Sequence, residues 1–153
     1  DVPMMAIDIL PTIAHITGAE LPANKIDGEN VWDIWTGKSN SSPHEAYYFY
    51  YHVNELHGIR YGKWKLYFPH RYRTLNGKEG GRNGLPVEYE YNTIDQIELY
   101  DLSTDISETQ DVSAENPEVV AKIKSLGDKI RAELGDALTD QAGTGSRPSG
   151  VIE

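Results

Sequence analysis

The sequence predicts an α+β fold in which an antiparallel β-sheet packs against a long C-terminal helix. Three observations support this fold class. Several short, strand-like segments follow one another between residues 46 and 102, and a single long amphipathic pattern follows them. The 153 residues, 39% of them hydrophobic, are also enough for one core of modest size.

The N-terminal region predicts a helix from Ile9 to about Thr17. We expect Asp8 to accept hydrogen bonds from the free amides at its start, and Gly18 to end it. A short helix-like piece, Val31–Trp35, ends at Gly37. The first helix has its apolar residues at helical spacing: Ile9, Leu10, Ile13 and Ile16.

The middle of the chain predicts the strands of the sheet. A tight turn at Gly62 joins two of them, and Pro69–Pro86 has no clear period, which is typical of a functional or disordered loop. The expected strands are Ala46–Tyr51, Leu56–Tyr61, Lys63–Phe68, Val87–Tyr91 and Glu98–Leu102.

The last predicted element is a helix with Asn116 as its N-cap and Pro117 in its first position. It is expected to end at Gly135. Its apolar stripe consists of Val119, Ile123, Leu126, Ile130 and Leu134. The segment from residue 139 to residue 153 is rich in Gly, Ser and Pro and is predicted to be a flexible tail.

Composition excludes several classes of function. A net charge of −10 disfavours binding to nucleic acid, and no apolar run is long enough to span a membrane. The absence of cysteine excludes disulfides, thiolate metal sites and cysteine nucleophiles within this chain. The basic residues nevertheless cluster between residues 63 and 82, which suits a small anionic ligand.

The segment Pro69–Leu75 holds the first candidate binding residues. Arg73 offers a planar fork of donors that matches sulfate, phosphate or carboxylate oxygens. His70 can donate a hydrogen bond, and Tyr72 can stack on a ring. The alternative is that the arginines pair with nearby glutamates while His70 caps the loop.

Other motifs favour structural roles. The alternation of residues 47–51 predicts a tyrosine-rich strand packed on both faces, although Tyr48 and Tyr50 are an alternative platform for sugar rings. Asp101 and Asp105 are predicted to belong to a turn. No residues have the spacing of a phosphate loop, a zinc site or a nucleophile elbow, and a Ser-His-Asp triad assembled in space stays open as an alternative.

Four segments in order resemble the C-terminal part of type I, formylglycine-dependent sulfatases of the alkaline-phosphatase-like superfamily, and the Pro69–Glu90 loop and the Gly-rich tail resemble its arylsulfatase A-like branch. The four segments are Asp8-Ile9-Leu10-Pro11-Thr12-Ile13, Ile26-Asp27-Gly28, Arg60-Tyr61-Gly62-Lys63-Trp64-Lys65-Leu66, and Glu98-Leu99-Tyr100-Asp101-Leu102 with Asp105 and Glu108. One departure is Ile106, which stands where the family usually has proline.

This resemblance implies a periplasmic or secreted sulfate ester hydrolase that acts on a sulfated small molecule or glycan. The family's formylglycine nucleophile and its divalent cation, usually calcium, belong to an upstream catalytic domain, so this chain alone is expected to bind neither cofactor and to be inactive. The alternatives are a non-catalytic carbohydrate-binding module and a phosphodiesterase or phosphonate hydrolase of the same superfamily.

The resemblance also divides the chain. Residues 1–38 correspond to the last helix and connecting segment of a large N-terminal domain, residues 39–138 to the C-terminal subdomain, and residues 139–153 to the tail. We expect the subdomain to form walls of the substrate pocket. The implied substrate-binding residues are His70, Arg73 and Tyr72, followed by Asn54 and Glu55 after the tyrosine-rich strand.

Overall fold

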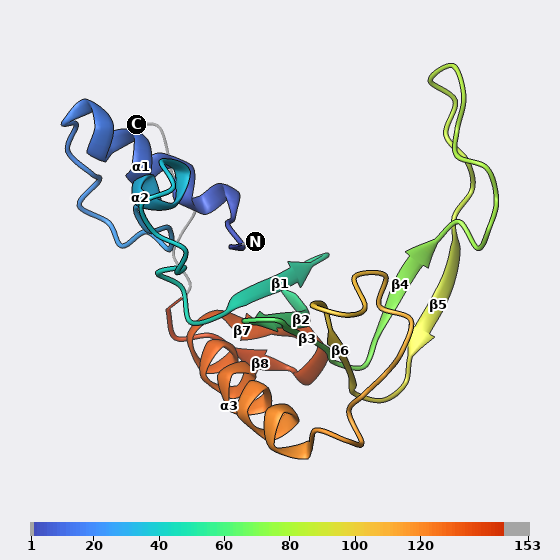
Figure 1. The fold of residues 1–153 in the computed structure, drawn as a ribbon. Helices are drawn as coiled ribbons and strands as arrows, with labels where there is room; N and C mark the ends of the chain where they lie inside the picture. The colour runs from blue at the N-terminus through green and yellow to red at the C-terminus, as the bar shows by residue number, and fades with distance from the viewer. Residues whose placement is uncertain (1, 146–153) are drawn as a thin grey trace. The chain divides into compact units, whose positions relative to one another are not determined.

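The computed structural model describes residues 2–145 (Figure 1). The chain divides into two compact units, residues 1–47 and residues 48–153. Each unit is described by itself below. Among the described residues, no helix is both long and apolar enough to cross a membrane.

The first unit contains a 3-10 helix, η1 (Ala6–Asp8), followed by α1 (Ile9–Thr17) and α2 (Trp32–Trp35). The bounds of α1 and its left-handed end at Gly18 confirm the prediction. The apolar stripe predicted for α1 is about half exposed, and its buried residues are instead Pro11, Thr12 and Ala14.

Asp8 does not cap α1, contrary to the expectation. Its backbone is helical because it ends η1, whereas a capping side chain needs an extended backbone. The fully buried carboxylate instead accepts hydrogen bonds from the amides of Met5 at 3.2 Å and Glu29 at 3.0 Å. His44 Nε2 lies 2.6 Å from the same carboxylate, so Asp8 joins three separate segments of this unit.

The second unit is built on a four-stranded sheet with the order β1-β2-β3-β6 (Figure 1). The pairs β2–β3 and β3–β6 are antiparallel, which places Ile59, Leu66 and Leu99 side by side. The strand bounds are β1 (Tyr47–Tyr51), β2 (Glu55–Tyr61), β3 (Trp64–Tyr67) and β6 (Glu98–Asp101). Four of the five predicted strands therefore form this sheet, and the strand predicted at Val87–Tyr91 is not part of it.

Helix α3 (Pro117–Leu134) covers one face of this sheet, as the fold class predicts. Its Ile123 and Leu126 are buried, and Gly127 lies so close to Phe68 and Ile59 that a Cβ there would be 2.8 Å from the Phe68 ring. Asn116 is the N-cap residue, as predicted, although its side chain makes no capping bond and donates to the carbonyl of Val112 at 2.9 Å. The more polar side chains of β3 and β6, which alternate with the buried ones, lie on the opposite face of the sheet.

The predicted loop Pro69–Pro86 begins with a strand. His70–Thr74 forms β4, which pairs antiparallel with β5 (Glu90–Ile94), and residues 75–89 connect them. The strand predicted at Val87–Tyr91 therefore starts three residues later than expected. Figure 1 shows β4 and β5 as a separate two-stranded ribbon beside the sheet.

The chain after α3 folds back onto the sheet. Gly135–Asp136 forms β7, which pairs with β8 (Gln141–Ala142), and a 3-10 helix, η2 (Ala137–Thr139), lies between them. The predicted tail therefore begins with paired backbone, and residues 146–153 of that tail lie outside the described residues.

The Asp136 carboxylate anchors this return. It is fully buried and accepts hydrogen bonds from the Leu56 amide at 3.2 Å, the Leu138 amide at 3.0 Å and Arg131 Nε at 2.8 Å. Nearby, the Tyr50 hydroxyl donates to the Gly135 carbonyl. Burial, reinforced by the Asp136 charge, raises the pKa of Tyr50 to about 12.

Candidate functional site

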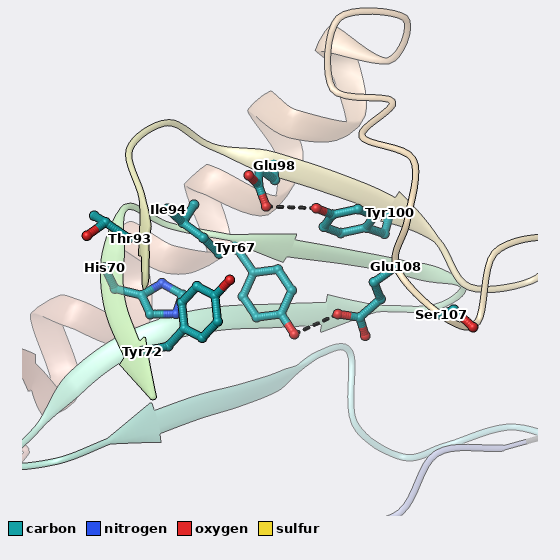
Figure 2. A pocket seen from close by; sticks show the side chains of 9 residues that line it. All are labelled: Tyr67, His70, Tyr72, Thr93, Ile94, Glu98, Tyr100, Ser107 and Glu108. Carbon is teal, nitrogen blue, oxygen red and sulfur yellow. Dashed lines mark hydrogen bonds between the residues drawn. The ribbon is translucent and has the colours of Figure 1, made fainter. Parts of the chain in front are cut away.

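The second unit contains a cavity of about 450 Å³ between the sheet, the β4–β5 ribbon and the loop after β6 (Figure 2). Its lining is rich in tyrosine and contains neither lysine nor arginine. The lining residues are Tyr67, His70, Tyr72, Thr93, Ile94, Glu98, Tyr100, Ser107 and Glu108.

Two tyrosine–glutamate pairs form the rigid part of the wall. The Tyr67 hydroxyl donates to Glu108 at 2.7 Å, and the Tyr100 hydroxyl donates to Glu98 at 2.7 Å (Figure 2). Burial raises the pKa of both tyrosines, so both hydroxyls stay protonated and their hydrogens are used within the wall. What these two tyrosines present to the cavity is therefore mainly ring surface.

Lys65 holds the Glu108 side of the wall in place. Its Nζ donates to Glu108 Oε1 at 2.6 Å and also lies over the Tyr67 ring. Burial acts to lower the pKa of Lys65, but its hydrogen bonds to Glu108 and Tyr67 outweigh burial and raise it. Glu108 reaches this position with a positive φ of 54°, an uncommon conformation for a residue other than glycine.

His70 presents one free nitrogen to the cavity. The side chain is buried, and Nδ1 donates to the Phe68 carbonyl at 2.7 Å. None of the described residues bonds to Nε2, and no buried side-chain nitrogen or oxygen among them lacks a partner, so Nε2 is a solvent-accessible atom of a residue that lines the cavity. In the neutral ring Nε2 is then a hydrogen-bond acceptor.

A second histidine supports His70. The two rings of His57 and His70 are stacked with their centroids 3.9 Å apart, and His57 Nε2 lies 2.9 Å from Glu55 Oε2. Burial lowers the pKa of His70, and the adjacent His57 adds to the lowering, more than the bond to the Phe68 carbonyl raises it. The free acceptor is therefore retained to lower pH than in an exposed histidine.

This geometry predicts a pH dependence of stability. The pKa of His70 is lower in the folded state than the ordinary value of about 6.5 in the unfolded chain. As pH falls below about 6.5 the unfolded chain takes up the proton first, so the free energy of unfolding decreases until the pH passes the folded-state pKa. Urea unfolding between about pH 7 and pH 5 should show this slope, and His70→Gln should reduce it.

The control for this measurement is His15→Gln, on the exposed surface of α1, which should leave the slope in place. An unchanged slope in the His70 variant would contradict the prediction.

The structure brings two of the predicted binding residues together at this cavity. His70 and Tyr72 lie on the same face of β4, with ring centroids 6.0 Å apart, and both line the cavity (Figure 2). No described residue bonds to the Tyr72 hydroxyl, which is therefore also accessible. A ring flanked by a hydroxyl and an acceptor nitrogen is suited to a ligand with hydroxyl groups.

The other predicted residues lie elsewhere. Arg73 points to the opposite face of β4, where it bonds to the Tyr51 hydroxyl. The Asn54 amide donates to the Leu134 carbonyl at 2.9 Å, which joins the turn after β1 to the end of α3. Glu55 pairs with His57, so it reaches the cavity only through the stacked histidines.

Of the two acidic residues predicted to belong to a turn, Asp101 is the last residue of β6 and Asp105 lies in the turn region that follows. Asp101 accepts bonds from Lys63 and Ser103, and Asp105 accepts bonds from Thr109 and the Gln110 amide. Within residues 2–145, no group of three or more histidine or carboxylate side chains could hold a metal ion.

Sequence reasoning missed the sheet side of the cavity, which comprises Tyr67, Tyr100 and their glutamate partners. The available signal was alternation, because Lys65 and Tyr67 lie on one face of β3. Their cross-strand partners Tyr100 and Glu98 lie on the same face of β6. The separation of Glu108 from Tyr67 by 41 residues gave no such signal.

Comparison with known proteins identifies the family. The family described as the C-terminal region of aryl-sulfatase matches residues 42–149. The chain belongs to this sulfatase family. The match covers the whole four-stranded sheet, the β4–β5 ribbon and α3, so it confirms the resemblance in the two segments that lie within it, Arg60–Leu66 and Glu98–Leu102.

Individual proteins that resemble the chain are also sulfatases. The chain is 30% identical to human arylsulfatase A over 145 residues, which is 88% of this chain and 27% of that protein. It is 30% identical over 141 residues to arylsulfatase H of Canis lupus familiaris, which is 86% of this chain and 24% of that protein. The chain thus spans about a quarter of the length of these sulfatases.

Solved structures share the fold. One, from work on the metabolism of multiple glycosaminoglycans by Bacteroides thetaiotaomicron, has a TM-score of 0.60 at 24% identity, covering 82% of this chain and 24% of that one. Another, in complex with its substrate D-glucosamine-2-N,6-O-disulfate, has a TM-score of 0.51 at 21% identity, covering 81% and 23%. The α+β subdomain predicted for this chain is therefore that of a sulfatase C-terminal region.

Proposed function

We propose that this chain is the C-terminal portion of a sulfatase that hydrolyses sulfate esters, and that its cavity is part of the substrate-pocket wall. The supporting observation is the pair of accessible polar atoms, His70 Nε2 and the Tyr72 hydroxyl, on a wall of tyrosine rings. These groups suit the hydroxyl-bearing or aromatic part of a substrate, such as a sugar or a phenol.

The sulfate group itself would be bound outside this cavity. The lining offers no lysine or arginine to an anion, and Glu98 and Glu108 add negative charge. We therefore assign to the cavity the part of the ester that remains after the sulfate has been removed. In this proposal the wall positions that part, and it does not take part in breaking the S–O bond.

The cofactors implied by the family do not fit the residues of this chain. It has no cysteine and no serine in a Ser-x-Pro/Ala-x-Arg sequence, and its described residues hold no cluster that could bind calcium or another divalent cation. We derive no reaction step through formylglycine or metal here. The proposal places both on the N-terminal catalytic domain and predicts that this chain alone is inactive.

In the same proposal, residues 1–38 belong to the N-terminal catalytic domain. The apolar stripe of α1 is about half exposed in this chain, which is expected of a helix that belongs to a larger domain. We also propose a periplasmic or secreted location, which rests on the family resemblance.

The tyrosine-rich strand gives less support to a separate carbohydrate-binding module. Tyr50 donates its hydroxyl to Gly135 and is half-buried, as is Tyr48. Neither ring is a free platform, so changing them should affect folding rather than ligand binding.

The test uses the sulfatase that contains this chain. His70→Ala and Tyr72→Ala should each raise KM for a sulfated sugar or aryl sulfate by roughly 10-fold, because each removes a contact worth about 1.4 kcal/mol. Leu85→Ala, an exposed residue of the same hairpin outside the cavity, is the control. Unchanged kinetics in both cavity variants would remove the cavity from the substrate pocket.

A further inference from the structure

The outer face of the β4–β5 ribbon carries a second set of functional groups. Alternation along β4 turns Arg71 and Arg73 away from the cavity that His70 and Tyr72 line. Both arginines are exposed and lie against tyrosine rings. We call this set the arginine–tyrosine ladder, and it consists of Arg71, Arg73, Tyr51, Tyr89 and Tyr91.

The contacts within the ladder hold the guanidinium groups in place. Arg71 lies over the Tyr91 ring at 4.0 Å, and Arg73 lies over the Tyr89 ring at 5.1 Å. Arg73 also donates to the Tyr51 hydroxyl, which leaves most of its donors unused. Tyr89 and Tyr91 are each 49% exposed, so the ladder is open to solvent.

The two ladder arginines differ from the other basic residues of the hairpin. Lys78 pairs with Glu90 at 2.7 Å, and Arg82 pairs with Glu79 at 2.5 Å. Within the described part of the chain, no carboxylate pairs with Arg71 or Arg73. These two positive charges are therefore not neutralised locally, although the whole chain has a net charge of −10.

We propose that the arginine–tyrosine ladder binds a sulfated oligosaccharide at a site separate from the cavity. A guanidinium fork matches the oxygens of one sulfate group, and arginine is the preferred residue for such bidentate recognition. Residues i and i+2 of a strand are roughly 7 Å apart, farther than the oxygens of a single sulfate reach. The ligand therefore carries at least two anionic groups.

The surroundings favour a sugar chain over other polyanions. Exposed tyrosine rings flank both forks and offer apolar surface to sugar rings. The negative charge of the rest of the protein repels a long duplex nucleic acid, whereas a short, flexible chain can contact the ribbon alone. The ladder thus acts as an additional site that retains a polymeric ligand.

The experiment titrates the complete 153-residue chain with a dextran sulfate oligosaccharide in a calorimeter. Arg71→Gln/Arg73→Gln should weaken binding at least 10-fold. The matched variant Lys78→Gln/Arg82→Gln removes the same charge from the same hairpin and should change binding less than 2-fold. Arg73→Lys keeps the charge but loses the fork, and should weaken binding a few-fold. Circular dichroism confirms that each variant folds.

Several outcomes would overturn the proposal. They are equal weakening by the two double variants, equal binding of unsulfated dextran, and equal binding of inorganic polyphosphate. Tyr72→Ala lies in the cavity and should leave this binding unchanged. A failure of the ladder is thereby distinguished from a failure of the proposed substrate pocket.

Discussion

Replacing Asp136 by alanine is expected to lower the free energy of unfolding by about 4 kcal/mol. The carboxylate is fully buried and accepts two amide hydrogen bonds and one from Arg131. Its removal leaves the Leu56 and Leu138 amides without their partner and the guanidinium of Arg131 without its nearest countercharge. A loss of this size is a large part of the stability of a domain of this length.

Urea unfolding followed by circular dichroism measures this effect. Asp128→Ala is the matched control, because Asp128 lies 3.7 Å from the same Arg131 but its side chain is 77% exposed. That control should cost less than about 1 kcal/mol. Asp136→Asn keeps an acceptor oxygen without the charge and should fall between the two. Equal stabilities of the Asp136→Ala and Asp128→Ala variants would contradict the anchoring role.

Replacing Gly28 by alanine is expected to destabilise the first unit by about 3 kcal/mol, since overpacking against rigid atoms is costly. A Cβ at this position would lie 1.9 Å from the carbonyl oxygen of Ile7 and 3.1 Å from the Asp8 amide nitrogen. Both neighbours are backbone atoms next to the buried Asp8 carboxylate, and neither can rotate away. The Asp-Gly segment of the sequence resemblance thus has a steric reason.

Hydrogen exchange of the Glu29 amide reports this effect locally, because that amide donates to Asp8. Gly28→Ala should reduce its protection strongly. Gly80→Ala is the control, because a Cβ there meets nothing within 4 Å and the backbone needs no positive φ. Wild-type protection of Glu29 in the Gly28 variant would show that the segment can shift without loss.

The regular elements could be predicted because each has a local pattern. The apolar spacing of Ile123, Leu126 and Ile130 predicts α3, and Gly135 predicts its end. Strand β4 was missed because Pro69 and the glycines that follow outweighed the alternation from His70 to Thr74. That alternation becomes a strand only when β5 pairs with it, which is a long-range property.

The site was predictable only in part for the same reason. His70 and Tyr72 could be nominated from their chemistry, but Arg73 was grouped with them by its position in the sequence alone. Once β4 is a strand, adjacent residues lie on opposite faces, and Arg73 is separated from both. The role of Asn54 depends on Leu134, 80 residues away, so no local pattern could reveal it.

The division of β4 into a cavity face and a ladder face has a consequence for changes in chain length. A single-residue insertion or deletion within His70–Thr74 would exchange the two faces, so that arginine forks would enter the tyrosine-lined cavity and the histidine would face solvent. The connection of residues 75–89 has no such constraint, because its length does not set the alternation. Length variation among homologous chains should therefore concentrate in that connection and be absent from the strand itself.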